Sequence, residues 1–262
     1  MPFLRWLSRR AKPPSIPAYR GPAGRRLYAV GDIHGRADLL DLVIGAIRTD
    51  AADAARRGLR PTAVFLGDYI DRGPDSRHVL DRLIELEPGA VDWHFLEGNH
   101  EAAMAGFIDA PHLNEIWLAY GGGATLQSYG VSSELGLEQA SEALRRALPA
   151  AHRAFLDRLP LSASFGDYFF VHAGIRPGID LSAQSEQDLL FIREPFLSSP
   201  LLHPKRVVHG HTISSQPEIL PARIGIDTGA YASGRLTCLV VEEDWTGFFS
   251  TRPDGSAVEW LD

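Results

Sequence analysis

Five short segments carry the side chains of this chain that could do chemistry, and each follows a short apolar, strand-like run. They are residues 31–35, 67–73, 98–101, 172–174 and 210–212. In open α/β sheets, ligands bind in the crevice outside the carboxyl ends of the strands. Five strand ends can therefore deliver side chains to one place although these are scattered from Asp32 to His211. We expect a single site there.

The side chains in these segments are typical metal ligands, and no thiolate lies among them. A mixture of carboxylates and imidazoles suits manganese, iron or zinc better than a cysteine-rich structural site. Two ions placed ~3.5–4 Å apart need a shared ligand, and Asp68 is the candidate for a bridging carboxylate. The candidate ligands are Asp32, His34, Asp68, Asn99, His172 and His211. This pattern predicts a two-metal phosphoesterase site.

The segments also resemble, in kind and order, the signature set of the phosphoprotein phosphatase family of calcineurin-like metallophosphoesterases, in its bacterial and phage form. The resemblance spans roughly residues 27–241. It implies that Asp32, His34 and Asp68 hold the first ion. It also implies that Asp68, Asn99, His172 and His211 hold the second, and that a metal-bound water is the nucleophile.

The same resemblance implies catalytic roles for four further side chains. His100 is expected to protonate the leaving oxygen, with Asp71 orienting it, and Arg72 to clamp the phosphate. A second clamp arginine is expected between the His172 and His211 motifs. Arg193 is the candidate, because the stretch around it resembles the bacterial and phage version of that part of the family. An imidazole near its neutral pKa can act as a general acid. Guanidinium groups bind two phosphate oxygens at once and match the charge of a loose phosphoryl transition state.

Simpler interpretations exist for each residue alone. A single Asp after a strand is usually a turn residue, and a single His is usually a structural group. His100 could be an orienting residue only, and Arg193 could form a surface salt bridge with Glu194 or a neighbour. The conjunction of Asp32-x-His34, Asp68-x-x-Asp71-Arg72 and Asn99-His100, each flanked by glycine, favours the site.

The sequence departs from the wider superfamily in its final motif, and from many phosphoprotein phosphatases at Glu97. The final motif lacks a second imidazole after His211, because position 213 is Ile213. In an extended chain His209 and His211 would point to the same side, so strand periodicity cannot separate them. The resemblance favours His211, and His209 is expected to be supporting or structural. Glu97 stands where many phosphoprotein phosphatases carry arginine, either lowering the attraction for polyanions or serving as a solvated strand-end charge.

Composition predicts a soluble cytoplasmic enzyme. The chain has 262 residues and is 45% hydrophobic, enough for one large α/β domain, and no apolar run approaches the ~18 residues of a transmembrane helix. The single cysteine, Cys238, excludes an internal disulfide, fits a reducing compartment and is expected to be buried.

Charge is unevenly distributed along the chain. Residues 1–26 hold seven basic and no acidic residues, against 19 basic and 33 acidic in the rest. This acidic body makes nucleic acid an unexpected partner, and no stable membrane association is expected.

The expected organisation is a basic flexible arm at residues 1–26 and a catalytic domain at residues 27–262. Residues 101–160 are expected to form a helical cap around a break at Gly121–Gly123. Helical spacing of apolar residues follows the first two motifs, and strand-like runs dominate from Tyr168 onward. This alternation predicts an α/β fold. The family resemblance makes it a two-sheet β-sandwich flanked by helices.

The leading functional prediction is a phosphatase, loaded with two divalent ions (Mn²⁺ first, Fe or Zn otherwise), that acts on phosphoserine, phosphothreonine or phosphotyrosine in proteins. The alternative is a symmetrical dinucleoside polyphosphate hydrolase of the same fold, for which the runs Gly121–Thr125 and Ile226–Ala230 also show kinship. A small phosphorylated metabolite is a third substrate class. A metal-binding regulatory protein without turnover is the non-enzymatic alternative.

Overall fold

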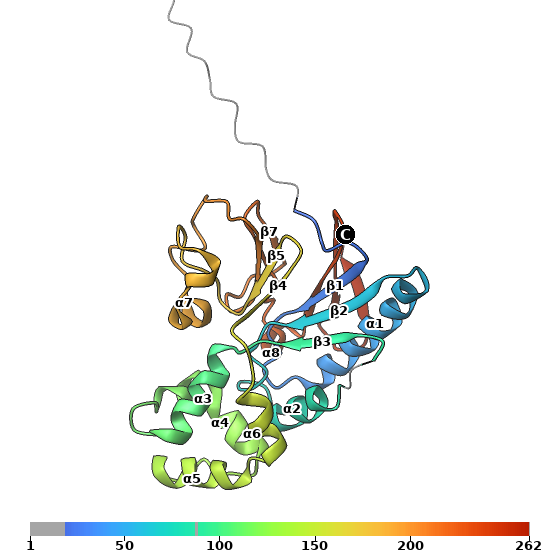
Figure 1. The fold of residues 1–262 in the computed structure, drawn as a ribbon. Coiled ribbons are helices and arrows are strands. Elements are labelled where there is room, and N and C mark those ends of the chain that lie inside the picture. Colours follow the sequence, from blue (N-terminus) through green and yellow to red (C-terminus); the bar gives the residue numbers. More distant parts are fainter. Residues whose placement is uncertain (1–18, 87–88, 262) are drawn as a thin grey trace, which may run out of the picture.

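The computed structural model describes residues 19–86 and 89–261. Two β-sheets pack face to face, with helices on their outer faces (Figure 1). The predicted α/β fold with two sheets and flanking helices is confirmed. Residues 1–18 of the predicted basic arm lie outside the described residues. No helix of the described chain is long and apolar enough to cross a membrane.

The first sheet has six strands in the order β11-β10-β9-β1-β2-β3. Strands β1, β2 and β3 are parallel, whereas β9, β10 and β11 run antiparallel to their neighbours. The strands are β1 (Arg25–Val30), β2 (Arg60–Phe65), β3 (Asp92–Phe95), β9 (Thr237–Glu242), β10 (Trp245–Thr251) and β11 (Val258–Leu261).

The second sheet has five strands in the order β4-β5-β6-β8-β7. Its central strands β5, β6 and β8 are parallel, and antiparallel β4 and β7 form the edges. The strands are β4 (Ser162–Phe165), β5 (Tyr168–Val171), β6 (Arg206–His209), β7 (Glu218–Ile219) and β8 (Arg223–Gly225).

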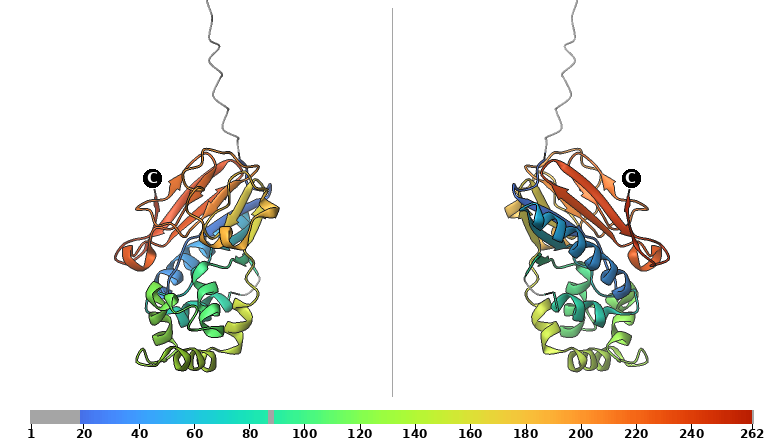
Figure 2. Two further views of the ribbon diagram at one scale, coloured as in Figure 1. Left: turned by 90° about the vertical axis from the view of Figure 1, so that its left-hand side faces the viewer. Right: turned by 90° about the vertical axis from the view of Figure 1, so that its right-hand side faces the viewer.

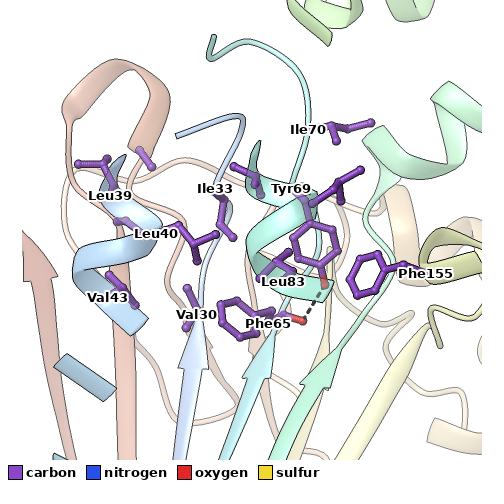
Figure 3. Packing of buried hydrophobic residues seen from close by; sticks show 14 of the residues in the cluster. Val30, Ile33, Leu39, Leu40, Val43, Phe65, Tyr69, Ile70, Leu83 and Phe155 are labelled. Atoms are coloured by element: carbon purple, nitrogen blue, oxygen red, sulfur yellow. Dashed lines mark hydrogen bonds between the residues drawn. The ribbon is translucent and has the colours of Figure 1, made fainter. Parts of the chain in front are cut away.

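Alternation of side chains along β1 explains how one sheet supports two cores. Tyr28 and Val30 pack with the helices, whereas Leu27 and Ala29 face the second sheet. Because successive side chains of a strand point to opposite faces, a strand covered on both sides is apolar throughout. Figure 3 shows the helix-side core, where Val30, Phe65 and Tyr69 lie beside residues of the first two helices.

Helices cover the outer face of each sheet. Helix α1 (Ala37–Arg56) and α2 (Ser76–Ile84) pack on the first sheet, and α7 (Glu186–Phe191) packs on Phe169 and Val207 of the second. Helix α1 ends at Arg56, with Gly58 in the left-handed region at φ +81°. A short 3₁₀ turn, η2 (Leu181–Ala183), precedes α7, and α8 (Ala230–Ser233) precedes β9.

The segment 101–160 forms a helical group at one end of the molecule (Figures 1 and 2). Its elements are α3 (Asn99–Asp109), the π-helical turn η1 (Leu118–Gly122), α4 (Gly123–Ser128), α5 (Leu137–Ala147) and α6 (Ala150–Leu156). The predicted break at the glycine run is a kink, because Gly121 has φ +114° inside the helical stretch. The predicted buried thiol is also confirmed, since Cys238 is fully buried in β9.

Candidate active site

Strands from both sheets deliver the candidate residues to one place. Asp32 and His34 follow β1, Asp68 follows β2, and Asn99 follows β3 at the start of α3. From the second sheet come His172 after β5 and His211 after β6. All five strands lie in parallel pairs, so their carboxyl ends share one edge of each sheet. Because the sheets pack face to face, the two edges meet and form one site.

The turns that carry these side chains are strained. A left-handed backbone is uncommon outside glycine and costs roughly 1–3 kcal/mol per residue, so it persists only where the surroundings impose it. Neighbouring glycines allow the close packing, since a Cβ at Gly73 would lie 2.1 Å from the His34 carbonyl oxygen. Five candidate residues adopt positive φ angles of 46–73°: His34, Asp68, Asp71, Arg72 and His211.

Glu101 ties two of these turns together. Its buried carboxylate accepts hydrogen bonds from the backbone N–H groups of Asp68 (2.9 Å), Tyr69 (2.8 Å) and Gly98 (3.0 Å). The strand ends of β2 and β3 are therefore held by one side chain. Sequence analysis included Glu101 in a motif but gave it no role.

Asp68 lies between two histidines. Its Oδ2 is 3.5 Å from His34 Nε2, and its Oδ1 is 3.4 Å from His172 Nε2. Each histidine donates its Nδ1–H to a backbone carbonyl, His34 to Ile70 (2.9 Å) and His172 to Leu66 (3.0 Å). These bonds fix the tautomers, because a carbonyl can only accept, and leave both Nε2 lone pairs facing Asp68.

Burial keeps the imidazoles neutral. It lowers the pKa of His34 and of His211 to about 3 each and also lowers the pKa of His172. A neutral imidazole is the form that binds metal ions. The histidines of the site are therefore in the ligating state at physiological pH.

A second cluster forms around Asn99. Its Oδ1 lies 2.8 Å from His172 Nε2 and 2.8 Å from His211 Nδ1, and these two ring nitrogens are 3.2 Å apart. Two groups of ligand atoms within 4.8 Å of one another result: His34, Asp68 and His100 in one, and Asp68, His172 and His211 in the other. Asp68 belongs to both, as a bridging ligand must.

Asp32 lies beside these groups, not within either of them. Its Oδ2 accepts the backbone N–H of His211 (3.0 Å), whereas its buried Oδ1 has no hydrogen-bond partner among the described residues. Burial, reinforced by Asp227 and Asp68, raises the pKa of Asp32. An unpartnered buried carboxylate oxygen is costly. The lone pairs gathered around Asp68, together with this oxygen, fit a pair of divalent cations.

His100 and Asp71 form a buried pair. Nδ1 of His100 donates to Oδ2 of Asp71 at 2.6 Å. Burial lowers the pKa of His100, but the carboxylates of Asp68 and Asp71 outweigh it, so the pKa lies above its ordinary value. The charged form of His100 therefore persists to higher pH than in a free histidine. This arrangement suits a proton donor.

Two residues of the helical group hold Asp71, and sequence analysis missed both roles. Trp117 donates its Nε1–H to Asp71 Oδ2 (2.7 Å), and the Thr125 hydroxyl donates to Oδ1 (2.5 Å). The glycine run makes this possible, because a Cβ at Gly122 would lie 2.5 Å from the Trp117 ring. The glycine run therefore allows close packing around the His100–Asp71 pair.

The two predicted clamp arginines lie at the rim. Arg72 NH1 lies 3.0 Å from His34 Nε2, and its guanidinium is 5.0 Å from the ring centre of half-exposed Tyr231. Arg193 is exposed and donates to the His211 carbonyl oxygen at 3.3 Å. Among the ion pairs of the described residues, none joins Arg193 to Glu194. The guanidinium of Arg193 is therefore open to an anion, whereas that of Arg72 also contacts His100, with NH2 3.2 Å from Nε2.

The structure separates His209 from His211. Strand β6 ends at His209, and the chain turns at Gly210, so the two side chains no longer share a strand face. His209 is fully buried, donates Nδ1–H to the Gly210 carbonyl (3.0 Å) and accepts from Arg223 at Nε2 (3.1 Å). Of these two histidines, His211 is the one that contacts Asn99.

These features place the chain among known proteins. The family model described as calcineurin-like phosphoesterase matches residues 25–231. The chain belongs to this family. Family membership makes it a metal-dependent phosphoester hydrolase and implies divalent metal ions at the site described above. Nothing in the match determines which metal is bound.

The most similar curated relatives share one name. Proteins called bis(5'-nucleosyl)-tetraphosphatase PrpE [asymmetrical] from Anoxybacillus flavithermus and Halalkalibacterium halodurans are 24% and 26% identical, over 80% of this chain in each case and 88% and 87% of theirs. A name specifying protein serine/threonine phosphatase activity does not occur among these relatives. The names of these relatives thus do not support the predicted resemblance to protein phosphatases in particular.

Solved structures share the fold. A candidate diadenosine tetraphosphatase superposes with a TM-score of 0.60 at 20% identity, covering 93% of this chain and 98% of that one. A cold-active protein-tyrosine phosphatase from a psychrophilic Shewanella gives 0.58 at 16% identity, covering 91% and 80%. At such identities the likeness concerns the fold alone.

Metal stoichiometry tests the assignment of His211. We expect His211→Ala to weaken or empty one of two metal sites, because it removes Nδ1 from the Asn99 cluster. His209→Ala should retain two ions, with at most the roughly 10–100-fold loss of affinity typical of orienting groups. The number of metal ions bound per chain is measured in both variants after dialysis. Two ions in His211→Ala and one in His209→Ala would reverse the assignment.

Trp117→Phe tests the support of the acid pair. It removes the N–H that Asp71 accepts, together with part of the indole, and keeps an aromatic ring beside Gly122. We expect both ions to remain and kcat on a substrate with a poor leaving group to fall about tenfold, equivalent to ~1.4 kcal/mol, with little change on p-nitrophenyl phosphate. Trp93→Phe, the same change away from Asp71, is the control. An equal loss on both substrates would argue against action through His100.

Proposed function

We propose that this protein hydrolyses bis(5'-nucleosyl) tetraphosphates, cutting them asymmetrically into a nucleoside triphosphate and a nucleoside monophosphate. The observation that carries the proposal is that relatives with this printed name align with 80% of the chain. The sequence analysis considered the symmetrical reaction, which yields two diphosphates. The names of the relatives favour the asymmetrical one.

In this proposal Asp68 would hold two divalent ions jointly, with His34 and Asp32 on one side and with Asn99, His172 and His211 on the other. Such ions, when bound, lower the pKa of water toward ~7 and so supply a nucleophile at neutral pH. One water is consumed: its oxygen bonds to the attacked phosphorus as the bridging P–O bond breaks. Arg72 and Arg193 bind the phosphate oxygens on which charge accumulates.

Side chains around Arg72 support a substrate with aromatic bases. Half-exposed Tyr231 lies against both Arg72 and His34, with ring centres of Tyr231 and His34 5.5 Å apart. Tyr120, also exposed, precedes Gly121, whose carbonyl accepts the Arg72 N–H (3.2 Å). Aromatic rings stack on nucleobases with little dependence on base identity. The two tyrosines therefore offer surfaces for a nucleoside beside the phosphate site.

A phosphoserine or phosphothreonine phosphatase is the second candidate, and the His100–Asp71 pair favours it. A serine alkoxide is a poor leaving group that needs a proton, whereas a nucleoside triphosphate leaves more readily. A well-formed proton donor is therefore of most use on phosphomonoesters. This argument concerns chemistry at the same metal site and leaves the ligand assignments unchanged.

Parallel assays separate the two candidates. The purified Mn²⁺-loaded protein is incubated with diadenosine tetraphosphate and with phosphoserine and phosphothreonine peptides, and nucleotide products are resolved by anion-exchange chromatography. We expect equimolar ATP and AMP. ADP as the sole product would restore the symmetrical reaction, and turnover of phosphopeptides alone would favour the second candidate. Asp68→Asn, expected to be inactive on every substrate, controls for contaminating hydrolases.

A further inference from the structure

A sixth parallel strand points to the same site. Strand β8 runs parallel to β6 and ends at Gly225, and the Ile226 N–H then donates to the His209 carbonyl (2.9 Å). Asp227 follows immediately, beyond the same edge of the sheet as His172 and His211. Each of the other parallel strands delivers a candidate metal ligand from this position. Asp227 has no assigned role in the site as described.

Asp32 and Asp227 lie on adjoining turns, since a Cβ at Gly31 would lie 3.6 Å from the Asp227 Cα, and, next to burial, the negative charge of Asp227 contributes to the raised pKa of Asp32. Both residues are almost fully buried, with exposed fractions of 1% for Asp227 and 2% for Asp32. One oxygen of each is occupied, since Asp227 Oδ1 accepts the Gly229 N–H (2.8 Å) and Asp32 Oδ2 accepts the His211 N–H. The other two, Asp227 Oδ2 and Asp32 Oδ1, have no hydrogen-bond partner among the described residues.

Glycines bring these carboxyl groups together. A Cβ at Gly31 would lie 2.6 Å from the Ile226 carbonyl oxygen, and one at Gly210 would lie 2.0 Å from Asp32 Oδ1. Bulkier residues at either position would push the two loops apart. The close approach of two acids is thus built into the packing of β1 against β6 and β8.

Two buried carboxylates close together repel each other unless a positive charge or a proton intervenes. In the part of the chain that the structure describes, neither Asp32 nor Asp227 has an Arg, Lys or His partner within 4.0 Å. Both unpartnered oxygens belong to the side of the site where Asp32 is expected to hold a cation. A divalent ion satisfies both oxygens and both charges at once.

We propose that Asp227 is a further acidic residue of this metal site, contributing charge and its free oxygen to the cation on the Asp32 side. The inference does not depend on which phosphate compound is hydrolysed. It requires only the divalent ions that membership of the family implies.

Asp227→Asn is a sharp test because it removes the charge and the unpartnered oxygen while keeping the shape of the side chain. The amide oxygen still accepts the Gly229 N–H, and the amide nitrogen takes the place of the unpartnered Oδ2. Titration of metal-free protein with Mn²⁺ by calorimetry should show one of two ions bound roughly 10–100-fold more weakly than in the parent protein. The metal-free variant should melt at a higher temperature than the metal-free parent, because the repulsion is relieved. The rise in melting temperature on adding Mn²⁺ should shrink.

Glu101→Gln is the matched control, the same acid-to-amide change at another buried carboxyl group of the site. The two oxygens of Glu101 accept four backbone N–H groups, and the amide nitrogen of Gln cannot accept, so this substitution should lower the melting temperature of the metal-free protein. Unchanged affinity of Asp227→Asn for both ions would overturn the proposal, leaving Asp227 as a hydrogen-bonding partner that asparagine replaces. A less stable metal-free Asp227→Asn, or one that fails to fold, would likewise overturn it.

Discussion

One buried carboxylate, Asp68, organises the site. It sits at the end of β2 in a left-handed turn, with one oxygen facing His34 and the other facing His172. The two histidines come from different sheets, so the position of Asp68 depends on how those sheets pack. Glu101 fixes the turn by accepting its N–H groups. A buried carboxylate among neutral imidazoles is costly without a cation, which is why the arrangement makes sense as a metal site.

The helical group is connected to the chemistry through Asp71. This carboxylate is fully buried and receives hydrogen bonds from His100, Trp117 and Thr125. The backbone N–H of Arg72 is bound to Gly121 of the same group. Movement of η1 would therefore disturb both His100, the candidate proton donor, and Arg72, a candidate clamp. The helical group thus supports the candidate catalytic residues directly.

Sequence alone predicted the fold class and the residues that gather at the site, because short apolar runs followed by glycine, Asp, Asn and His mark strand ends. It could not separate His209 from His211, since the left-handed turn after β6 breaks strand periodicity. It missed Asp227 as a neighbour of Asp32, because β8 has only three residues and its parallel pairing with β6 is a tertiary property. It also missed Trp117, whose contact with Asp71 spans distant parts of the chain. The cytoplasmic location, the basic arm and the individual ligand roles stay predictions.

The most direct test of the central claim is electron paramagnetic resonance of the wild-type protein loaded with Mn²⁺. Two ions sharing the Asp68 carboxylate should be magnetically coupled. The account predicts two ions per chain and a low-temperature spectrum of a spin-coupled pair. A spectrum of isolated Mn²⁺ at full occupancy, or saturation at one ion per chain, would contradict a dinuclear site bridged by Asp68.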